Sequence, residues 1–344
     1  MESFDGTVFP QKVVAVIWDF DKTLVSGYMQ TPLFERFKVD EDRFWKEVNG
    51  LPTFYRKHGY ELFPRDIGYL SHMLTYVREG IFSGLNNRLL RELGAELSFY
   101  PGLPAAFRRL KRHIEEDPRF SKHEIRLEHY IVSTGLRQMI LGSKIAKYVD
   151  GVWACELLGV TAPANYLTTP PSGNEDADEA ELQAVAYAID NTTKTRAVFE
   201  INKGVNKHPT EITVNDKMPL TDRRVPLDQM IYVADGPSDV PVFSIVNQAQ
   251  GKTFAVYSPK ASEQEFKQVQ DLQDEGRVMS FGPADYKPGT HTDRCLTSWA
   301  EEIAERIASR FQRRLVEHIG KPPEHIVDPM TAGKSAAKLA TPPN

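Results

Sequence analysis

Two aspartates stand one residue apart at the end of an apolar run near the start of the chain. The run, residues 13–18, is rich in β-branched side chains and has almost no polar alternation, so it predicts a buried parallel strand. Asp19 and Asp21 follow it directly, and the carboxyl ends of such strands are where α/β sheets bind ligands. Two carboxylates so close repel each other and are not tolerated unpaired in a core. A cationic group is therefore expected beside them.

Further polar groups follow apolar strands or begin a helix later in the chain. Hydroxyls and a glycine end an expected strand over 128–132, a lysine begins an expected helix, and two aspartates follow an expected strand over 230–234. These residues are Ser133, Thr134, Gly135, Lys194, Asp235 and Asp239. Because ligands bind at the carboxyl ends of parallel strands, we expect these side chains to face one crevice. Carboxylates in such a crevice suit a hard divalent cation such as Mg²⁺.

Strands that alternate with helical segments predict an α/β fold, with a Rossmann-like three-layer core and a mostly parallel sheet. Further strands are expected over 152–158, 184–190 and 253–257, and Trp299 opens an amphipathic helix with an apolar residue every four positions.

Between the first strand and Tyr100 the pattern is helical, beginning with a helix over 31–49 that Gly50-Leu51-Pro52 should end. We expect an α/β core made of residues 1–25 and 99–318 and an inserted helical cap over 26–98. The final residues, 319–344, are expected to be a disordered tail.

The order of these elements resembles the haloacid-dehalogenase-like hydrolases, most of which are magnesium-dependent phosphatases. Asp19-x-Asp21-x-Thr23-Leu24 is similar to the first motif of that family. The strand-end serine, the helix-start lysine and Asp235-Gly236-Pro237-Ser238-Asp239 come in the order of its other motifs. The similarity spans most of residues 13–260, and the inserted helices point to the phosphoserine-phosphatase-like branch.

The resemblance implies a role for each residue. Asp19 is implied to be the nucleophile that forms an aspartyl-phosphate, and Asp21 the general acid and base. Mg²⁺ is implied to bind Asp19, Asp235 and the backbone carbonyl at Asp21. The residues implied to hold the phosphate are Ser133, Thr134, Gly135 and Lys194, and those implied to support the site are Thr23 and Asp239. The implied activity is hydrolysis of a small-molecule phosphomonoester.

Two residues depart from the family pattern. Lys22 replaces the small residue that is frequent inside the first motif. Tyr28 stands in the neighbourhood where the branch often carries an acidic residue that grips a substrate amine. Serine phosphate is therefore not implied as the substrate.

One assignment and two functions stay open at this point. Lys203 competes with Lys194 for the role of the motif lysine, and Lys194 is favoured because it begins a helix directly after a strand-like segment. The same residues suit phosphoryl transfer to an acceptor other than water, as in sugar-phosphate mutases. A non-catalytic binding or regulatory protein with this fold is the alternative from another class.

The composition of the chain limits the classes of binding partner and the cellular compartment that can be expected. The chain of 344 residues has a net charge of −5, which gives no reason to expect nucleic acid or an acidic membrane as a partner. No stretch approaches the roughly 18 apolar residues of a membrane span, and the first residues lack a signal-peptide pattern. Cys155 and Cys295 have no second thiol or histidine at metal spacing, which is typical of a reducing compartment. We expect a cytoplasmic protein that acts on a small molecule.

Overall fold

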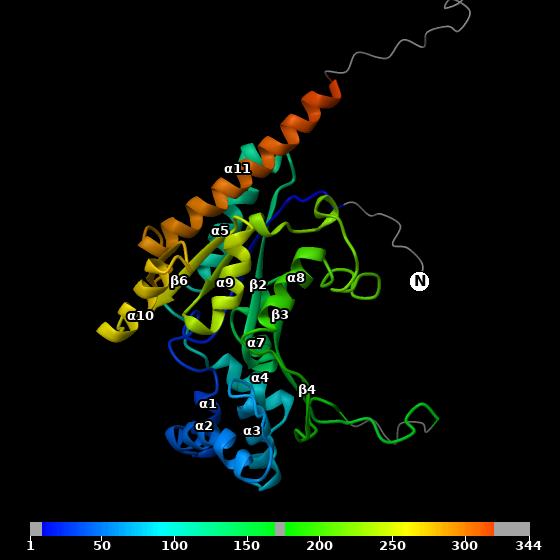
Figure 1. The fold of residues 1–344 in the computed structure, drawn as a ribbon, viewed down its shortest axis with the longest axis vertical. Helices are drawn as coiled ribbons and strands as arrows, with labels where there is room; N and C mark the ends of the chain where they lie inside the picture. The colour runs from blue at the N-terminus through cyan, green and yellow to red at the C-terminus, as the bar shows by residue number, and fades with distance from the viewer. Residues whose placement is uncertain (1–8, 169–175, 320–344) are drawn as a thin grey trace, which may run out of the picture.

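Seven strands form one sheet in the order β4-β3-β2-β1-β5-β6-β7 in the computed structural model, which describes residues 9–168 and 176–319 (Figure 1). All neighbouring strands are parallel except β3 and β4. The strands are β1 (Val13–Trp18), β2 (Arg126–Leu136), β3 (Gly151–Leu158), β4 (Ala184–Tyr187), β5 (Met230–Ala234), β6 (Lys252–Tyr257) and β7 (Ser280–Pro283). The tail expected over 319–344 lies outside the described residues, apart from the end of the last helix.

The helices occupy the connections between these strands. Before β2 they are α1 (Thr31–Phe37), α2 (Glu41–Lys57), α3 (Gly68–Arg78), α4 (Asn87–Ala95), α5 (Ala105–Glu115) and α6 (Pro118–Ser121). After β2 they are α7 (Arg137–Gly142), α8 (Lys194–Lys203), α9 (Val240–Gln248), α10 (Glu263–Asp274) and α11 (His291–Ile319).

Strand β1 is buried on both faces, and its side chains alternate between two hydrophobic clusters. Trp18 and the residues at 14 and 16 share a cluster with apolar side chains of α5 and α11. Ile17 and the residues at 13 and 15 share the other cluster with side chains of α8, α9 and α10. Two helical layers therefore enclose the sheet, and the predicted three-layer α/β fold with a mostly parallel sheet is confirmed.

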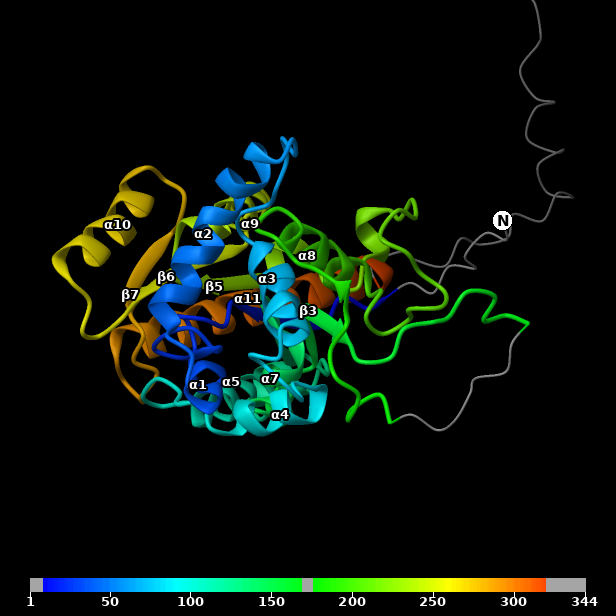
Figure 2. The same cartoon turned by 90° about the horizontal axis from the view of Figure 1, so that it is seen from below.

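Helices α1, α2 and α3 lie together at the end of the molecule toward which β2 and α7 run (Figures 1 and 2). Two hydrogen bonds join this group to the carboxyl edge of the sheet. The hydroxyl of Tyr69 on α3 donates to the carbonyl of Thr134 (2.7 Å), and the backbone N–H of Asn191 donates to the Asp66 carboxylate (3.2 Å). The helical segment that the sequence predicted after the first strand thus lies beside the strand ends.

The single helix predicted over 31–49 is wrong, because two helices occupy this region and the second continues past Gly50 and Pro52. Lys38 adopts a left-handed conformation (φ 55°) that ends α1, and the Asp40 carboxylate caps α2 by accepting from Arg43 N–H. Phe44 and Val48 before the expected break and Leu51 within it are buried on one face of α2, so packing outweighs the breaking effect of Gly50 and Pro52.

The chain after residue 257 contains core elements that the sequence analysis did not anticipate. Strand β7 pairs in parallel with β6. Helix α10 packs through Val269 and Leu272 into the hydrophobic cluster that contains Ile17. Strand β2 also runs further than predicted, to Leu136, with an irregularity in its pairing with β3 between Val132 and Leu136. The Ser133 region is therefore part of a bent strand and not a turn after one.

Two glycines allow α4 to pack closely on α7. A Cβ atom on Gly94 would overlap the backbone carbonyl of Met139, and one on Gly142 would overlap the backbone carbonyl of Arg91. Since α7 directly follows β2, this contact fixes α4 to the part of the core that carries Ser133.

We predict that Gly94→Ala lowers the free energy of unfolding by about 1–3 kcal/mol, because a methyl group must displace a backbone in a tight contact. The matched control is Gly50→Ala in α2, where nothing lies within 4 Å of the new Cβ. That substitution should raise the free energy of unfolding by about 0.5–1 kcal/mol through helix propensity. Urea unfolding of both variants checks the prediction, and equal effects would contradict the proposed close contact.

Candidate active site

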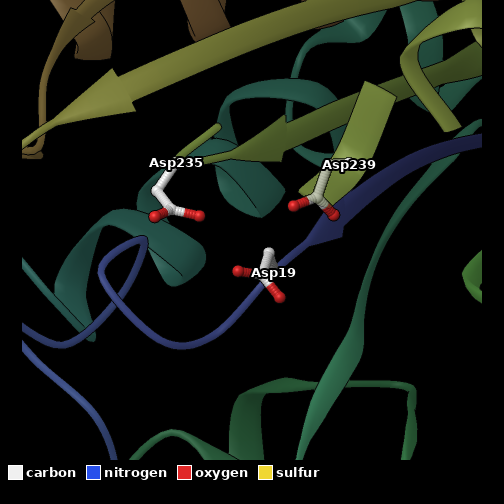
Figure 3. A group of neighbouring side chains, drawn as sticks. All are labelled: Asp19, Asp235 and Asp239. Carbon is white, nitrogen blue, oxygen red and sulfur yellow. The ribbon is translucent and has the colours of Figure 1, made fainter. Parts of the chain in front are cut away.

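Asp19 and Asp235 meet at the point where the chain order along the sheet reverses. Strands β2 and β3 lie on one side of β1, and β5, β6 and β7 lie on the other, so a crevice forms at the carboxyl ends of β1 and β5. Asp19 follows β1 directly, and its backbone N–H donates to the carbonyl of Val233 on β5 (2.9 Å). Asp235 follows β5 directly, and Figure 3 shows its carboxyl group close to that of Asp19.

Lys194 supplies the cation that the sequence analysis expected beside the carboxylates. Its ammonium donates to Asp19 Oδ1 (2.9 Å) and to Asp239 Oδ1 (2.7 Å), and the side chain is only 1% exposed. Burial alone would lower the pKa of Lys194, but the charges of Asp19 and Asp239 outweigh it and raise this pKa, so the ammonium stays charged. The alternative, Lys203, donates elsewhere, to the carbonyls of Val214 and Asp216.

Asp239 is held by donors on both carboxylate oxygens. Oδ1 accepts from Lys194 and from the hydroxyl of Tyr232 (2.5 Å), and Oδ2 accepts from the hydroxyl of Ser238 (2.7 Å). The side chain is fully buried, on a short turn between β5 and α9. Asp239 therefore fixes the position of Lys194.

Three carboxylate groups meet in the crevice. One oxygen atom from each of Asp19, Asp235 and Asp239 lies within 4.8 Å of the other two (Figure 3). Asp239 already accepts three hydrogen bonds. The Asp235 carboxylate accepts none from the residues that the structure describes, although Asp19 and Asp239 lie close to it. A partly buried carboxylate without a donor and next to other carboxylates fits a hard cation, so the arrangement suits Mg²⁺ held by Asp19 and Asp235.

Burial and mutual repulsion change the acidity of these carboxyl groups. Burial raises the pKa of Asp19 to about 6, against the opposing charge of Lys194. Burial and the charge of Asp19 raise the pKa of Asp235 to about 7. Asp21 accepts from the backbone N–H of Met29 (2.8 Å), yet burial and the charge of Asp19 raise its pKa well above the usual range. Asp21 can therefore carry a proton under conditions where an exposed aspartate cannot.

Ser133 lies at the end of β2, beside β1. It is buried, and its Oγ accepts from the backbone N–H of Gly135 (3.0 Å). The next N–H, of Leu136, points to the sulfur of Met29 (3.1 Å), and a Cβ on Gly135 would meet the same methionine. Thr134 contributes its carbonyl to Tyr69, as described above. The sulfur and methyl group of Met29, from the loop that carries Asp21, thus pack directly against the backbone at Gly135.

The structure brings four of the nine predicted site residues into one chain of direct contacts. Asp19, Lys194 and Asp239 form one hydrogen-bonded chain, and Thr23 Oγ1 lies 3.5 Å from Asp19 Oδ2. Asp21 and Asp235 flank this chain. Ser133, Thr134 and Gly135 lie at the neighbouring strand end and form no hydrogen bond with the chain itself within the described ranges, 9–168 and 176–319.

Several supporting residues escaped the sequence analysis. Tyr232 lies inside a strand that reads as uniformly apolar, and its hydroxyl reaches Asp239. Tyr286, distant in sequence, donates to the carbonyl of Thr23 (2.6 Å). Met29 contributes an amide to Asp21 and its sulfur to Leu136. Only Tyr232 carried a signal, because an aromatic hydroxyl in a buried strand needs a partner.

The strand order defines an α/β protein with a mostly parallel seven-stranded sheet, and the site residues follow its strands in the order on which the resemblance to the haloacid-dehalogenase-like hydrolases rests. No family model matches the chain. An uncharacterized protein from Borreliella burgdorferi is 41% identical over 297 residues, which cover 85% of this chain and 96% of that protein. The chain belongs to the same family as this Borreliella protein.

Several solved structures are similar to the chain at low sequence identity. A HAD family hydrolase from Salmonella enterica serovar Typhi has a TM-score of 0.46 at 12% identity and covers 79% of this chain and 67% of its own. A phospho-aspartyl intermediate analogue of phosphoserine phosphatase has a TM-score of 0.42 at 15% identity and covers 78% of this chain and 93% of its own. A probable phosphoserine phosphatase from Vibrio cholerae has a TM-score of 0.44 at 13% identity and covers 88% of this chain and 69% of its own. Similarity at this level says nothing of activity.

Within residues 9–168 and 176–319, every helix is too short or too polar to cross a membrane.

We predict that Asp235→Asn stabilises the metal-free protein by about 2 kcal/mol more at pH 8 than at pH 5. The pKa of Asp235 is raised from 3.8 to about 7 on folding, so its contribution to stability is complete below pH 4 and is lost as pH rises through 7. Asparagine removes the charge that causes this loss.

Urea unfolding at both pH values, with and without Mg²⁺, checks this prediction. Mg²⁺ should stabilise the native protein more at pH 8 than at pH 5, and should lose this effect in Asp235→Asn. Asp271→Asn on the exposed face of α10 is the control for a changed net charge. An equal effect of Asp235→Asn on stability at pH 8 and at pH 5 would contradict the assigned repulsion.

Proposed function

We propose that the protein is a magnesium-dependent phosphatase that hydrolyses a small-molecule phosphomonoester through an aspartyl-phosphate on Asp19. The observation that carries the proposal is the contact between Asp19 and the buried ammonium of Lys194, with Asp235 beside it and Asp21 two residues further on. A phosphate group that enters this crevice finds a nucleophile, a fixed cation and a proton donor. These are the groups that phosphoryl transfer from an ester needs.

In the first step, an oxygen of Asp19 forms a bond to phosphorus as the bond from phosphorus to the ester oxygen breaks. Asp21 donates its proton to the departing alkoxide, which leaves as an alcohol. In the second step, Asp21 accepts a proton from water as the water oxygen attacks phosphorus. The bond to Asp19 then breaks, and inorganic phosphate and the Asp19 carboxylate result.

Lys194 and the end of β2 hold the phosphate in this scheme. Lys194 donates one hydrogen to Asp239 and one to Asp19, and its third hydrogen is available for a phosphate oxygen. Ser133 is close to β1, and its hydroxyl, which accepts from Gly135 N–H and keeps its own hydrogen, would hold a further phosphate oxygen. Mg²⁺ at Asp19 and Asp235 would neutralise negative charge on the phosphate when bound.

The assignment is tested with purified protein, p-nitrophenyl phosphate and Mg²⁺. We predict that Asp19→Asn abolishes turnover and that Asp21→Asn lowers kcat by about 10²- to 10⁴-fold, because the general base that accepts a proton from water in the second step is lost. A chelator should abolish the activity of the native protein, and Mg²⁺ should restore it.

Asp274→Asn, an exposed substitution on α10, should keep the native rate. Circular dichroism shows whether the inactive variants remain folded. Phosphate and p-nitrophenol should appear in equal amounts; an excess of p-nitrophenol would favour transfer to another acceptor. Full activity in excess chelator, or a folded Asp19→Asn protein with the native rate, would contradict the proposal.

We also propose that the helical segment 26–98 acts as a cap that excludes water when a substrate binds. Support comes from α3, which reaches the strand ends through Tyr69, and from Asp66, which contacts the segment before Lys194. A cap in this position restricts access to small molecules. Helix α4 packs on α7, so we expect the mobile part to be α1, α2 and α3.

Hydrogen exchange with and without beryllium fluoride and Mg²⁺ tests the cap. Amides of α2 and α3 should exchange more slowly when the phosphate analogue is bound, because closure buries them. Helix α11, which packs on the face of the sheet that carries Trp18, serves as the internal control. Unchanged exchange in α2 and α3 with slower exchange at Asp19 would show a rigid helical region.

A further inference from the structure

Lys22 occupies an unusual backbone position directly after Asp21. Its φ of 54° lies in the left-handed region, which residues with a Cβ atom rarely adopt. The backbone N–H of Lys22 donates to the carbonyl of Gly27 (3.2 Å), so the loop holds the residue in this conformation. A glycine would fit here without strain, and the sequence nevertheless places a long cationic side chain at the position. Strain of this kind is found where a side chain has a function.

The side chain of Lys22 lines a cavity of about 140 Å³ beside the candidate active site. The same cavity is lined by Asp235 and by polar side chains of Tyr100, Ser258, Glu265 and Gln268. A water molecule takes roughly 30 Å³ of liquid, so the cavity has room for a group of a few non-hydrogen atoms. It adjoins the two places that matter for the proposed reaction, which are the Asp235 carboxylate and the loop that carries the proton donor.

Lys22 has no acidic partner within salt-bridge distance among residues 9–168 and 176–319. Its ammonium lies 3.2 Å from the hydroxyl of Tyr28 and 4.6 Å from the centre of that ring. Of the charged residues around the cavity, Glu265 is already used, because its carboxylate accepts from the backbone N–H of Ser262 at the start of α10. Lys22 is the one cation among the residues that line the cavity.

We propose that this cavity receives the leaving group of the substrate and that Lys22 pairs with a second anionic group there, a carboxylate or a phosphate. The inference rests on the proposed phosphatase activity, because Asp21 marks where the ester oxygen must lie and Lys22 is the next residue. Lys22 is thus a residue that determines specificity, and the substrate class is a phosphomonoester with a second negative charge. The alternative is that Lys22 only offsets the negative charge of Asp235. In that case the acidic residues that line the cavity, Asp235 and Glu265, would favour a cationic leaving group.

Turnover of matched phosphomonoesters tests the proposal. Glycerol 3-phosphate, 3-phosphoglycerate and phosphoethanolamine present a neutral, an anionic and a cationic leaving group of similar size. 1,3-Propanediol bisphosphate against 1,3-propanediol monophosphate shows whether phosphate replaces carboxylate as the second group. The native protein should prefer the anionic member of each comparison. Lys22→Met should lower its kcat/KM about tenfold or more, with little change for glycerol 3-phosphate.

Two variants separate recognition from structure. Lys22→Gly suits the left-handed backbone, so it should fold and still lose the preference, whereas Lys22→Arg should keep much of it. Lys260→Met removes an exposed lysine that does not line the cavity, and it should behave as the native protein. A preference that persists in Lys22→Met and Lys22→Gly, or a native preference for phosphoethanolamine, would overturn the proposal.

Binding supplies a measurement that does not need turnover. In an Asp19→Asn background with Mg²⁺, calorimetry should show 3-phosphoglycerate binding about tenfold more tightly than glycerol 3-phosphate, and Lys22→Met should remove the difference. Equal affinities would refute the role of Lys22. If the native protein hydrolyses p-nitrophenyl phosphate and the affinities are equal, only this inference fails. If no ester is hydrolysed but the Lys22-dependent difference is present, the catalytic proposal fails and the anion site stands.

Discussion

The arrangement of the candidate site depends on one buried ammonium between two carboxylates. Lys194 is almost completely enclosed, and only its contacts with Asp19 and Asp239 offset the cost of removing its charge from water. Breaking such a buried pair from one side typically costs about 3–5 kcal/mol, so each member holds the others in place. Tyr232 and Ser238 extend the constraint by donating to Asp239. The nucleophile candidate is thus fixed by electrostatics before any phosphate arrives.

The fold explains how residues so far apart in sequence reach this ammonium. Parallel pairing of β1 with β5 places Asp19 beside Asp235, and both strands are buried between two helical layers that hold them in register. Lys194 arrives from the start of α8, which packs against the same face as Ile17. The carboxyl groups outnumber the ammonium groups at this edge, and burial together with the charges of Asp19 and Asp239 raises the pKa of Asp235. This excess negative charge accounts for the fit to a divalent cation.

The sequence predicted the parts of the molecule whose signal is local. The apolar run before Asp19 and the one before Asp235 each predicted a strand, and β5 has the predicted bounds. Helix bounds near Gly50 and Pro52 could not be predicted, because burial of Phe44 and Leu51 overrides the local preference for a break. The supporting contacts of Met29 and Tyr286 could not be predicted either, since they join residues distant in sequence through a backbone amide and a backbone carbonyl. The cavity beside Lys22 depends on α10, whose start is marked in the sequence by the capping box of Ser262 and Glu265, a signal that the sequence analysis missed.

The central claim is that Asp19 carries the phosphoryl group during turnover. Rapid acid quenching of the native protein during hydrolysis of p-nitrophenyl phosphate with Mg²⁺, followed by borohydride reduction, converts an aspartyl-phosphate to homoserine. Peptide mass spectrometry should then find homoserine at position 19 and aspartate at position 21. Phosphate release that proceeds at the full rate with unmodified Asp19 at every quench time would contradict the account.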